Sequence, residues 1–570
     1  MTVKQFYLMG LGERSAKQFD IGSPKSLSEL QASVARAYNI LSPKHITFHH
    51  RDAELQSVED VFRSDPIGIT VDGHSIREPQ APEGLPFFGN HFELYPDHVG
   101  NHERLFAKYG SVIKTNNMGR ITYLTNDPEI AAVVLKEGDY FTKAPSDPSH
   151  PIYGIRDETA LFLCDTDHPA WKEAHKFIPP SMSPKAVRHY TPLLQKAVEK
   201  SFNVLDEVDT RGEAFNVYRF TAKLASQIIC QLVLGIDLHH FDSPEAPLHR
   251  VIVLLNQYLT LNRRVQTKGA WYSYIPFGDP VLLKQTRSEL YGIIEEAIQA
   301  CKLGGSTDLP IHDAALHATC IVDYLTRATD ERGTKLRRSY VLSNTLALVG
   351  AGFVTSSSLL AWLIYALATH AGGAHQRRLL QELVDAGAAH NKTWTYDEIH
   401  SLRFLDAFVK ETQRVHGPSF QPARNARADV VLPGGWAVPR GAIVIPSLPH
   451  IHRHRDHWAN RDVFDPGRWL RDDGKTNERH RASFIPFATG ARGCIGFNVA
   501  LQEVKVALAE LVYRYEFFDA SEQAIEYDPE FIVIRPMNFY ARAVRRTSWP
   551  EPRRSSAVGE VAEANGLSNS

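Results

Sequence analysis

The chain has 570 residues, of which 43% are hydrophobic and 22% are charged, and its formal net charge is −2. This length allows two or more domains with a sizeable core, and the composition is ordinary for a soluble globular protein. The near-neutral charge gives no electrostatic reason to expect nucleic acid or an anionic membrane as the main partner.

The N-terminus and the cysteines indicate the compartment. Residues 1–18 carry charges throughout and no long apolar stretch, so we expect neither a signal peptide nor a transmembrane anchor. The cysteines are few and widely spaced, which favours a reducing compartment over a disulfide framework. They are Cys164, Cys230, Cys301, Cys320 and Cys494. We therefore expect a cytoplasmic protein, and peripheral attachment to the endoplasmic reticulum membrane is left open.

Residues 1–72 differ in pattern from the rest of the chain. Short apolar runs predict strands, and a capping-box pattern at Ser26 and Glu29 opens a helix, in the order β-β-α-β-short helix-β. This order resembles the ubiquitin-like β-grasp, although no residue motif supports it. Two readings stay open: a docking module for a protein partner or for the large domain, and a folded cap without a role of its own.

Two polar stretches set the remaining domain boundaries. Residues 78–90 are rich in proline and glycine, and we place a linker at 73–81 and a large domain at 82–546. Residues 547–570 are too polar and small to bury a core, so we expect a disordered tail.

Two predicted helices of the large domain carry polar groups at regular spacing. Trp171 and His175 lie four residues apart on one helical face, and their N–H groups suit an anionic partner. Further on, the apolar segment 346–369 contains Ala351, Gly352 and Thr355. It is long enough to span a bilayer, but we interpret it as a buried core helix.

A helix predicted at 401–416 carries Glu411 and Arg414, which share one face and can form an ion pair. A dense run of histidines follows. It comprises His450, His452, His454 and His457. This run lacks the cysteine or carboxylate pattern of a zinc site, so we do not predict a metal there.

The most informative segment is a loop that reads F-x-x-G-x-R-x-C-x-G. Its fixed positions are Phe487, Gly490, Arg492, Cys494 and Gly496. Glycines let backbone N–H groups approach the sulfur, and a helix follows directly, so a thiolate there is stabilised as an anion. An axial ligand of haem iron needs such a thiolate. The alternative is a buried structural cysteine, which is the usual state of a free thiol.

This loop, FATGARGCIG, resembles the haem-binding loop of the cytochrome P-450 superfamily, the haem-thiolate monooxygenases, at every defining position. Three other segments resemble the same family. They are the proline-rich hinge at 78–90, the E-x-x-R helix at Glu411–Arg414 and the segment 464–469 with Arg468. The flanking sequence is closest to soluble bacterial and fungal fatty-acid hydroxylases, here without a fused reductase.

The resemblance implies a mainly α fold with small β-sheets and a haem b cofactor whose iron is ligated by Cys494. Trp171, His175 and Arg492, with Arg424 as a further candidate, would bind the haem propionates. Glu411, Arg414 and Arg468 would lock the core behind the thiolate loop. The full set of implied cofactor-binding residues is Cys494, Arg492, Trp171, His175, Phe487, Gly490, Gly496 and Arg424.

The apolar helix implies a catalytic distal side with one departure from the family. Ala351, Gly352 and Thr355 match the pattern A/G-G-x-D/E-T, in which glycine leaves room for dioxygen and threonine provides a hydroxyl. The usual acid is replaced by Val354, and no aspartate or glutamate occurs between Glu331 and Glu382. The standard proton route is therefore in doubt.

The resemblance predicts a monooxygenase that activates dioxygen and oxidises a small organic substrate, by analogy in secondary metabolism, with electrons from a separate NADPH-dependent reductase. Two alternatives stay open. One is a haem-thiolate enzyme without a reductase, namely a peroxygenase, isomerase, dehydratase or radical-coupling enzyme. The other is a non-catalytic haem-binding interaction protein. Val354 keeps the first alternative open, and Gly352 and Thr355 argue against the second.

Overall fold

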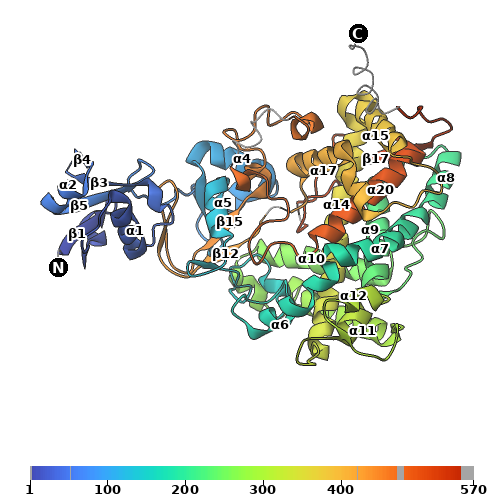
Figure 1. The fold of residues 1–570 in the computed structure, drawn as a ribbon, viewed down its shortest axis with the longest axis horizontal. Coiled ribbons are helices and arrows are strands. Elements are labelled where there is room, and N and C mark those ends of the chain that lie inside the picture. The colour runs from blue at the N-terminus through green and yellow to red at the C-terminus, as the bar shows by residue number, and fades with distance from the viewer. Residues whose placement is uncertain (1–2, 52, 420, 472–479, 530, 554–570) are drawn as a thin grey trace, which may run out of the picture.

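A computed structural model describes residues 3–51, 53–419, 421–471, 480–529 and 531–553 of the chain. A small α+β domain lies at one end and a large, mainly helical domain forms the rest (Figure 1). The predicted fold class, a small α+β domain before a mainly α domain with small sheets, is confirmed.

The small domain is a mixed sheet covered by one helix. Its strands have the order β2-β1-β5-β3-β4, with β1 and β5 parallel. The elements are β1 (Val3–Leu8), β2 (Lys17–Asp20), α1 (Leu27–Tyr38), β3 (Ile46–His50), β4 (Ala53–Leu55), α2 (Val58–Arg63) and β5 (Ile67–Val71). The Ser26 hydroxyl caps α1 by accepting from the Glu29 N–H. These elements follow the order expected from the sequence, while the ubiquitin-like label stays a prediction.

The small domain is tied to the large one through a hairpin of β13 (Val430–Leu432) and β14 (Trp436–Val438). The Leu41 N–H donates to the Val431 carbonyl over 2.9 Å, and Val431 is part of the small domain's apolar core. Within the segment predicted as a linker, the Arg77 N–H donates to the Gly435 carbonyl, and its guanidinium lies 3.9 Å from the centre of the Trp436 ring.

A shortened protein that begins at Pro79 should still take up haem, because none of the described residues before Pro79 lines the cavity described below. It should also be less soluble, since Val431 and Trp436 would lose the cover that buries them. Haem content and light scattering of the purified shortened protein would check both expectations. Failure to bind haem would mean that the hairpin contact determines the shape of the large domain.

The large domain is built mainly from helices. They are α3 (His91–Leu94), α4 (His98–Tyr109), α5 (Pro128–Val134), α6 (Pro169–Phe177), α7 (Pro184–Glu199), α8 (Phe202–Thr210), α9 (Val217–Leu234), α10 (Arg250–Gln266), α11 (Asp279–Ala300), α12 (Ala314–His317), α13 (Ile321–Arg327), α14 (Arg338–Thr369), α15 (Ala374–Asp385), α16 (Tyr396–Ser401), α17 (Arg403–His416), α18 (Leu448–Ile451) and α20 (Phe497–Arg514).

Short strands accompany these helices. They are β6 (Val112–Asn117), β7 (Arg120–Thr125), β8 (Phe141–Thr142), β9 (Phe215–Asn216), β10 (Leu309–Pro310), β11 (Ala328–Thr329), β12 (Arg424–Ala426), β15 (Ile443–Pro446), β16 (Tyr515–Asp519) and β17 (Tyr540–Arg545). The longest sheet has the order β6-β7-β15-β12-β8, and β16-β17-β9 form another.

Helix α14 runs through the middle of the large domain and packs against α9, α17 and α20 (Figure 1). It passes the length and hydropathy test for a membrane span, but 72% of its most apolar window is buried inside the protein. The interpretation as a core helix is thus confirmed. A Cβ at Gly352 would lie 2.6 Å from the Ile229 side chain, so glycine lets α14 approach α9 without moving that side chain.

Candidate functional site

One internal cavity of about 420 Å³ collects almost all the residues predicted to form the site. It lies between α14, α6, the segment 418–424 and the loop that leads into α20. The predicted residues on its wall are Ala351, Gly352, Thr355, Cys494, Arg492, Trp171, His175, Phe487, Gly496 and Arg424. Gly490 is not on the wall and instead shapes the loop from behind.

The loop before α20 presents the Cys494 sulfur to this cavity. The Cys494 N–H donates to the Phe487 carbonyl over 2.9 Å, which closes the loop. Gly490 has φ +78°, and a Cβ there would meet the Leu135 carbonyl oxygen at 2.6 Å, so the position requires glycine. Burial raises the pKa of the Cys494 thiol, and the Gly496 N–H only opposes this rise. The backbone amides of the loop therefore only partly offset the effect of burial on this thiol.

One wall of the cavity is strongly cationic. Lys143 and Arg424 are buried, and Arg492 lies beside them with its guanidinium 5.5 Å from the centre of the Trp171 ring. The pKa of Lys143 is well below its ordinary value, mainly because the side chain is buried and further because the charges of Arg492 and Arg424 oppose its own charge. Burial also lowers the pKa of Arg424 to about 10, against the opposing charge of Glu137.

Several nitrogens of this wall have no hydrogen-bond partner among the described residues. They are Arg424 Nη2, Arg492 Nη1 and His150 Nε2. Because buried donors without acceptors are unfavourable, this set fits a ligand with more than one anionic group, as the two propionates of haem provide. Trp171 and His175 stand on the same side, with ring centres 4.8 Å apart. The site thus fits the cofactor implied by the sequence.

Lys143 and His150 were not predicted from the sequence. Both line the cavity beside Arg424 and Arg492, and burial, followed by the charge of Lys143, lowers the pKa of His150 well below its ordinary value, so that His150 is neutral there. Lys143 follows the two-residue strand β8 and donates to the Phe162 carbonyl over 2.7 Å. No motif surrounds either residue, so only the fold reveals them.

The opposite wall is formed by α14. The Thr355 hydroxyl donates to the Ala351 carbonyl over 3.0 Å and faces the cavity beside Gly352. Val354 is buried and also lines the cavity. Ser356, which follows Thr355, donates a hydrogen bond to the Glu503 carboxyl on α20. The sequence did not point to Glu503.

Apolar side chains form most of the remaining wall. They include Ile152, Ile155, Leu161, Ile229, Leu255, Leu346, Leu359, Ile532 and Val533. Such a lining favours an organic substrate and excludes water from it.

A buried ion network locks the structure behind the thiolate loop. Arg414 Nη2 lies 2.9 Å from Glu411 Oε1, and Arg468 Nε lies 3.0 Å from the same oxygen. Glu411 and Arg414 are both 0% exposed. The indole N–H of Trp469 donates to Glu411 Oε2 over 2.9 Å. The structure therefore brings together the three residues predicted to form this lock.

The lock reaches the thiolate loop through His452. Arg414 Nη1 donates to the His452 carbonyl over 3.4 Å, and His452 Nε2 accepts from the Ile485 N–H over 3.0 Å. Of the four histidines in this run, His450 is buried as well, beside the Ser447 hydroxyl and the Val99 carbonyl. Within the described residues, no group of three or more histidine, cysteine or acidic side chains is placed to hold a metal ion.

His452 should make the protein sensitive to acid. Burial, followed by the charge of Arg414, lowers the pKa of His452 to about 3. The unfolded chain takes up this proton below about pH 6.5, so the free energy of unfolding should fall as pH falls from about 6.5 to 3. His452→Gln can still accept from the Ile485 N–H and should reduce this slope by up to about 1.4 kcal/mol per pH unit. Denaturant unfolding at several pH values would measure the slope.

His189→Gln serves as the control, because His189 is exposed on α7. Its slope should equal that of the wild type. An unchanged slope in His452→Gln would contradict the assignment of the acid sensitivity to His452.

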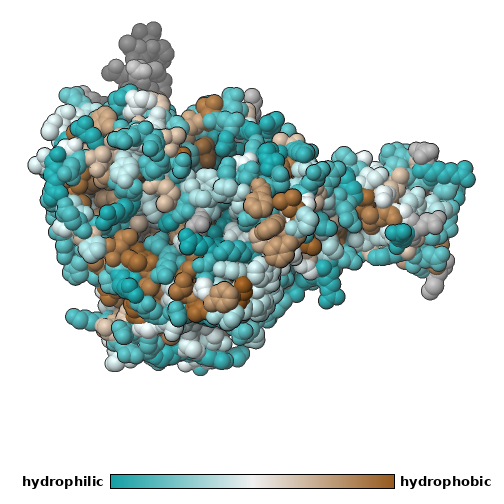
Figure 2. Space-filling model, turned by 180° about the vertical axis from the view of Figure 1, so that it is seen from behind, coloured by the Kyte–Doolittle hydropathy of each residue, from teal (hydrophilic) through white to brown (hydrophobic). Residues whose placement is uncertain are grey.

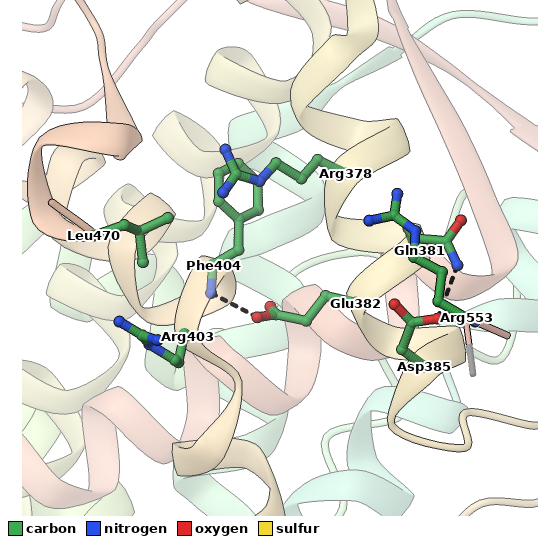
Figure 3. Close-up of a pocket in the computed structure, with 8 residues that line it drawn as sticks. All are labelled: Arg378, Gln381, Glu382, Asp385, Arg403, Phe404, Leu470 and Arg553. Carbon is green, nitrogen blue, oxygen red and sulfur yellow. Dashed lines mark hydrogen bonds between the residues drawn. The ribbon is translucent and has the colours of Figure 1, made fainter. Parts of the chain in front are cut away.

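A second pocket, of about 360 Å³, lies at the surface between α15 and α17 and contains none of the predicted site residues (Figure 3). Glu382 points to the start of α17, where it accepts from the Phe404 and Leu405 N–H groups. Asp385 accepts from the Arg553 N–H over 2.7 Å. The Glu382 carboxylate thus joins α15 to α17, and the Asp385 carboxylate holds the backbone at Arg553.

The comparisons with known proteins agree on one family. The family model "Cytochrome P450" matches residues 79–542. The chain is 67% identical over 553 residues to cytochrome P450 monooxygenase alnD of Emericella nidulans, covering 96% of this chain and 99% of the relative. It is 24% identical to thromboxane-A synthase of Rattus norvegicus, covering 76% of this chain and 86% of that enzyme. The crystal structure of the cytochrome P450DA heme domain matches with a TM-score of 0.72 and 21% identity, covering 83% and 98% of the two chains.

Proposed function

The chain belongs to the cytochrome P450 family, and we propose that Cys494 is the protein ligand of its haem iron. The family makes it a monooxygenase with haem b, an organic substrate, dioxygen and a redox partner. The observation that carries the proposal is the cavity itself. Cys494, the cationic wall and the wall formed by α14 all line this one cavity. The five matched positions of the loop support it as well.

Bound haem would supply the activation of dioxygen, in which two electrons and two protons are consumed, one oxygen atom goes to the substrate and the other leaves as water. In the proposal, the haem propionates would be held by the polar side chains on one side of the cavity. These are Arg424, Arg492, Lys143, His150, Trp171 and His175. Gly352 would leave room in the cavity for dioxygen, and Thr355 lines the same cavity beside it. Phe487 and Gly496 shape the thiolate loop, and Ala351 accepts from Thr355. The apolar walls orient the substrate and exclude water.

We propose that a separate NADPH-dependent reductase supplies the electrons and that the product belongs to secondary metabolism. The high identity with a fungal monooxygenase supports this placement. We further propose that the small domain serves chiefly to dock onto the large one. Its hydrogen bonds to the β13–β14 hairpin favour this role. The alternative is binding of a separate protein partner, for which the edge strand β2 offers a free side.

A cytoplasmic location with peripheral attachment to the endoplasmic reticulum membrane completes the proposal. Several aromatic side chains are exposed, including Phe87 at 67% and Tyr274 at 68%. The Phe87 and Trp271 rings lie 5.9 Å apart. On one face of the molecule, hydrophobic surface gathers close to where the small domain meets the large one (Figure 2). Aromatic residues favour the membrane–water interface. In a flotation experiment, phospholipid vesicles should carry the wild-type protein upward in the gradient. The double variant Phe87→Ser with Trp271→Ser should stay at the bottom.

Turnover with NADPH and a surrogate reductase tests the enzymatic proposal. Extract of a producing organism in which the gene has been deleted would supply the substrate. We expect a product that depends on NADPH and contains one oxygen atom from labelled dioxygen. A product formed with peroxide alone, or without any oxidant, would favour the reductase-independent alternative, which Val354 supports.

A further inference from the structure

Two of the five cysteines, Cys301 and Cys320, lie against each other although they are 19 positions apart in the chain. Their sulfur atoms are 3.3 Å apart, and both are free thiols. A disulfide bond is about 2.05 Å long, so a small movement of the two side chains would bring the sulfurs to bonding distance. Neither residue lines the cavity described above, so the pair has no part in the proposed haem site.

The backbone around the pair holds the two sulfurs close without a bond between them. Cys301 directly follows α11, and Cys320 begins α13 as its N-cap. The Thr319 hydroxyl donates to the Lys302 carbonyl over 2.9 Å, which joins the two ends of the segment between the cysteines. Asp323 accepts from the Thr319 N–H over 2.8 Å. The fold itself therefore maintains the contact between the thiols.

The two thiols have different surroundings. Cys320 is 1% exposed, and its sulfur accepts from the Asp323 N–H over 3.4 Å. Because this sulfur is already an acceptor, the S–H of Cys301 is the donor between the two. That hydrogen bond lowers the pKa of Cys320 to about 7, against the effect of burial, and it raises the pKa of Cys301. Cys320 is therefore the thiol that ionises near neutral pH, and the thiolate is the reactive form.

A small oxidant can reach the pair from the side of Cys301. This residue is partly exposed, and α11, which ends beside it, lies at the lower edge of the large domain (Figure 1). Residues 302–308, which follow, are exposed. Asp323 is paired with Arg327 over 3.3 Å, so its negative charge beside the thiolate is largely compensated.

We propose that Cys301 and Cys320 are a peroxide-sensitive pair of thiols whose disulfide fastens the end of α11 to the start of α13. The Cys320 thiolate attacks hydrogen peroxide, the O–O bond breaks, and the sulfur becomes a sulfenic acid while one water leaves. The Cys301 sulfur then attacks the Cys320 sulfur, the S–O bond breaks, and a second water leaves. In total, two thiols lose two electrons and two protons, and one hydrogen peroxide becomes two waters.

The disulfide connects a wall of the cavity to the core of the large domain. α11 packs against α10, and Tyr291 on α11 and Tyr258 on α10 both line the cavity. α13 packs against α9 and α14. The bond also closes a loop in the unfolded chain, which stabilises the folded protein. Oxidation should therefore raise Tm by about 3 °C.

Tryptic digestion tests the bond directly, because Lys302 is the only lysine or arginine between the two cysteines. The full-length holoprotein is treated with a small excess of hydrogen peroxide, the remaining thiols are alkylated in denaturant, and the protein is digested without reductant. Peptides 288–302 and 303–327 should appear as one linked species that separates on reduction. Because the bond uses two of the five thiols, three should remain to be alkylated.

Cysteine variants assign the roles of the two thiols. Cys301→Ser should give no linked peptide and no rise in Tm, and a dione reagent should trap the sulfenic acid left on Cys320. Cys320→Ser should leave Cys301 unoxidised by the same treatment. Cys230→Ser is the matched control, because Cys230 is buried and burial raises the pKa of its thiol to about 12. It should give the linked peptide and the same rise in Tm as the wild type.

Separate peptides in the oxidised wild type, with both thiols alkylated, would overturn the proposal. A linked peptide that forms only after the protein has been unfolded would do the same, since the folded contact would then not carry the reaction. A linked peptide in the native protein with an unchanged Tm would overturn the fastening of α11 to α13. None of these readouts uses turnover with NADPH, so their failure and the failure of the proposed function are distinguishable.

Discussion

Replacing Cys494 by serine should abolish the red-shifted Soret band that the ferrous protein shows with carbon monoxide. The sulfur is the group that the loop before α20 presents to the cavity. Serine places a hydroxyl there, and a hydroxyl does not give the electron density by which a thiolate favours O–O cleavage. NADPH-dependent product formation should therefore fall by about 10⁴-fold or more, because enzymes provide accelerations of at least about 10⁶-fold.

Cys301→Ser provides the control, since Cys301 is only partly buried and lies outside the cavity wall. It should keep both the Soret band and turnover. A Cys494→Ser protein that retains the band would show that another residue ligates the iron, and Cys164 would be the next to examine. Cys164 is buried, and its carbonyl accepts from Arg492 over 2.8 Å.

The parts of the site that could be predicted from the sequence are those formed by neighbouring residues. The thiolate loop lies within ten residues, so one glycine at a fixed φ and one arginine at a fixed offset identify it. Glu411 and Arg414 are one helical turn apart, and helix geometry alone places them on one face. Local geometry therefore carried these predictions.

The residues that could not be predicted are brought together by tertiary folding. Lys143 and Arg424 are far apart in sequence and meet because β8 pairs with β12. Glu503 meets Ser356 only because α20 packs on α14. No spacing rule relates such pairs. The stretch 73–81 was predicted as a linker from composition alone, and its pairing to Gly435 depends on a hairpin more than 300 residues later in the chain.

Removing the Glu411 carboxylate should have the largest effect on stability. It accepts from Arg414 and Arg468 and from the Trp469 indole, so Glu411→Ala leaves two buried guanidinium groups without their anion. Breaking a buried ion pair on one side is worth about 3–5 kcal/mol of the free energy of unfolding. We expect little soluble holoprotein, measured by haem content and denaturant unfolding.

Two further variants give a graded comparison. Arg468→Met keeps the Glu411–Arg414 pair and should lose less stability than Glu411→Ala. Lys410→Ala breaks a partly exposed pair with Asp406, which keeps its partner Lys505, and should change the free energy of unfolding by about 0.5 kcal/mol. A Glu411→Ala protein as stable as Lys410→Ala would refute the lock. A third outcome is a Glu411→Ala protein that remains folded but loses haem. The lock would then act on the position of the thiolate loop, through His452 and the Ile485 N–H, rather than on global stability.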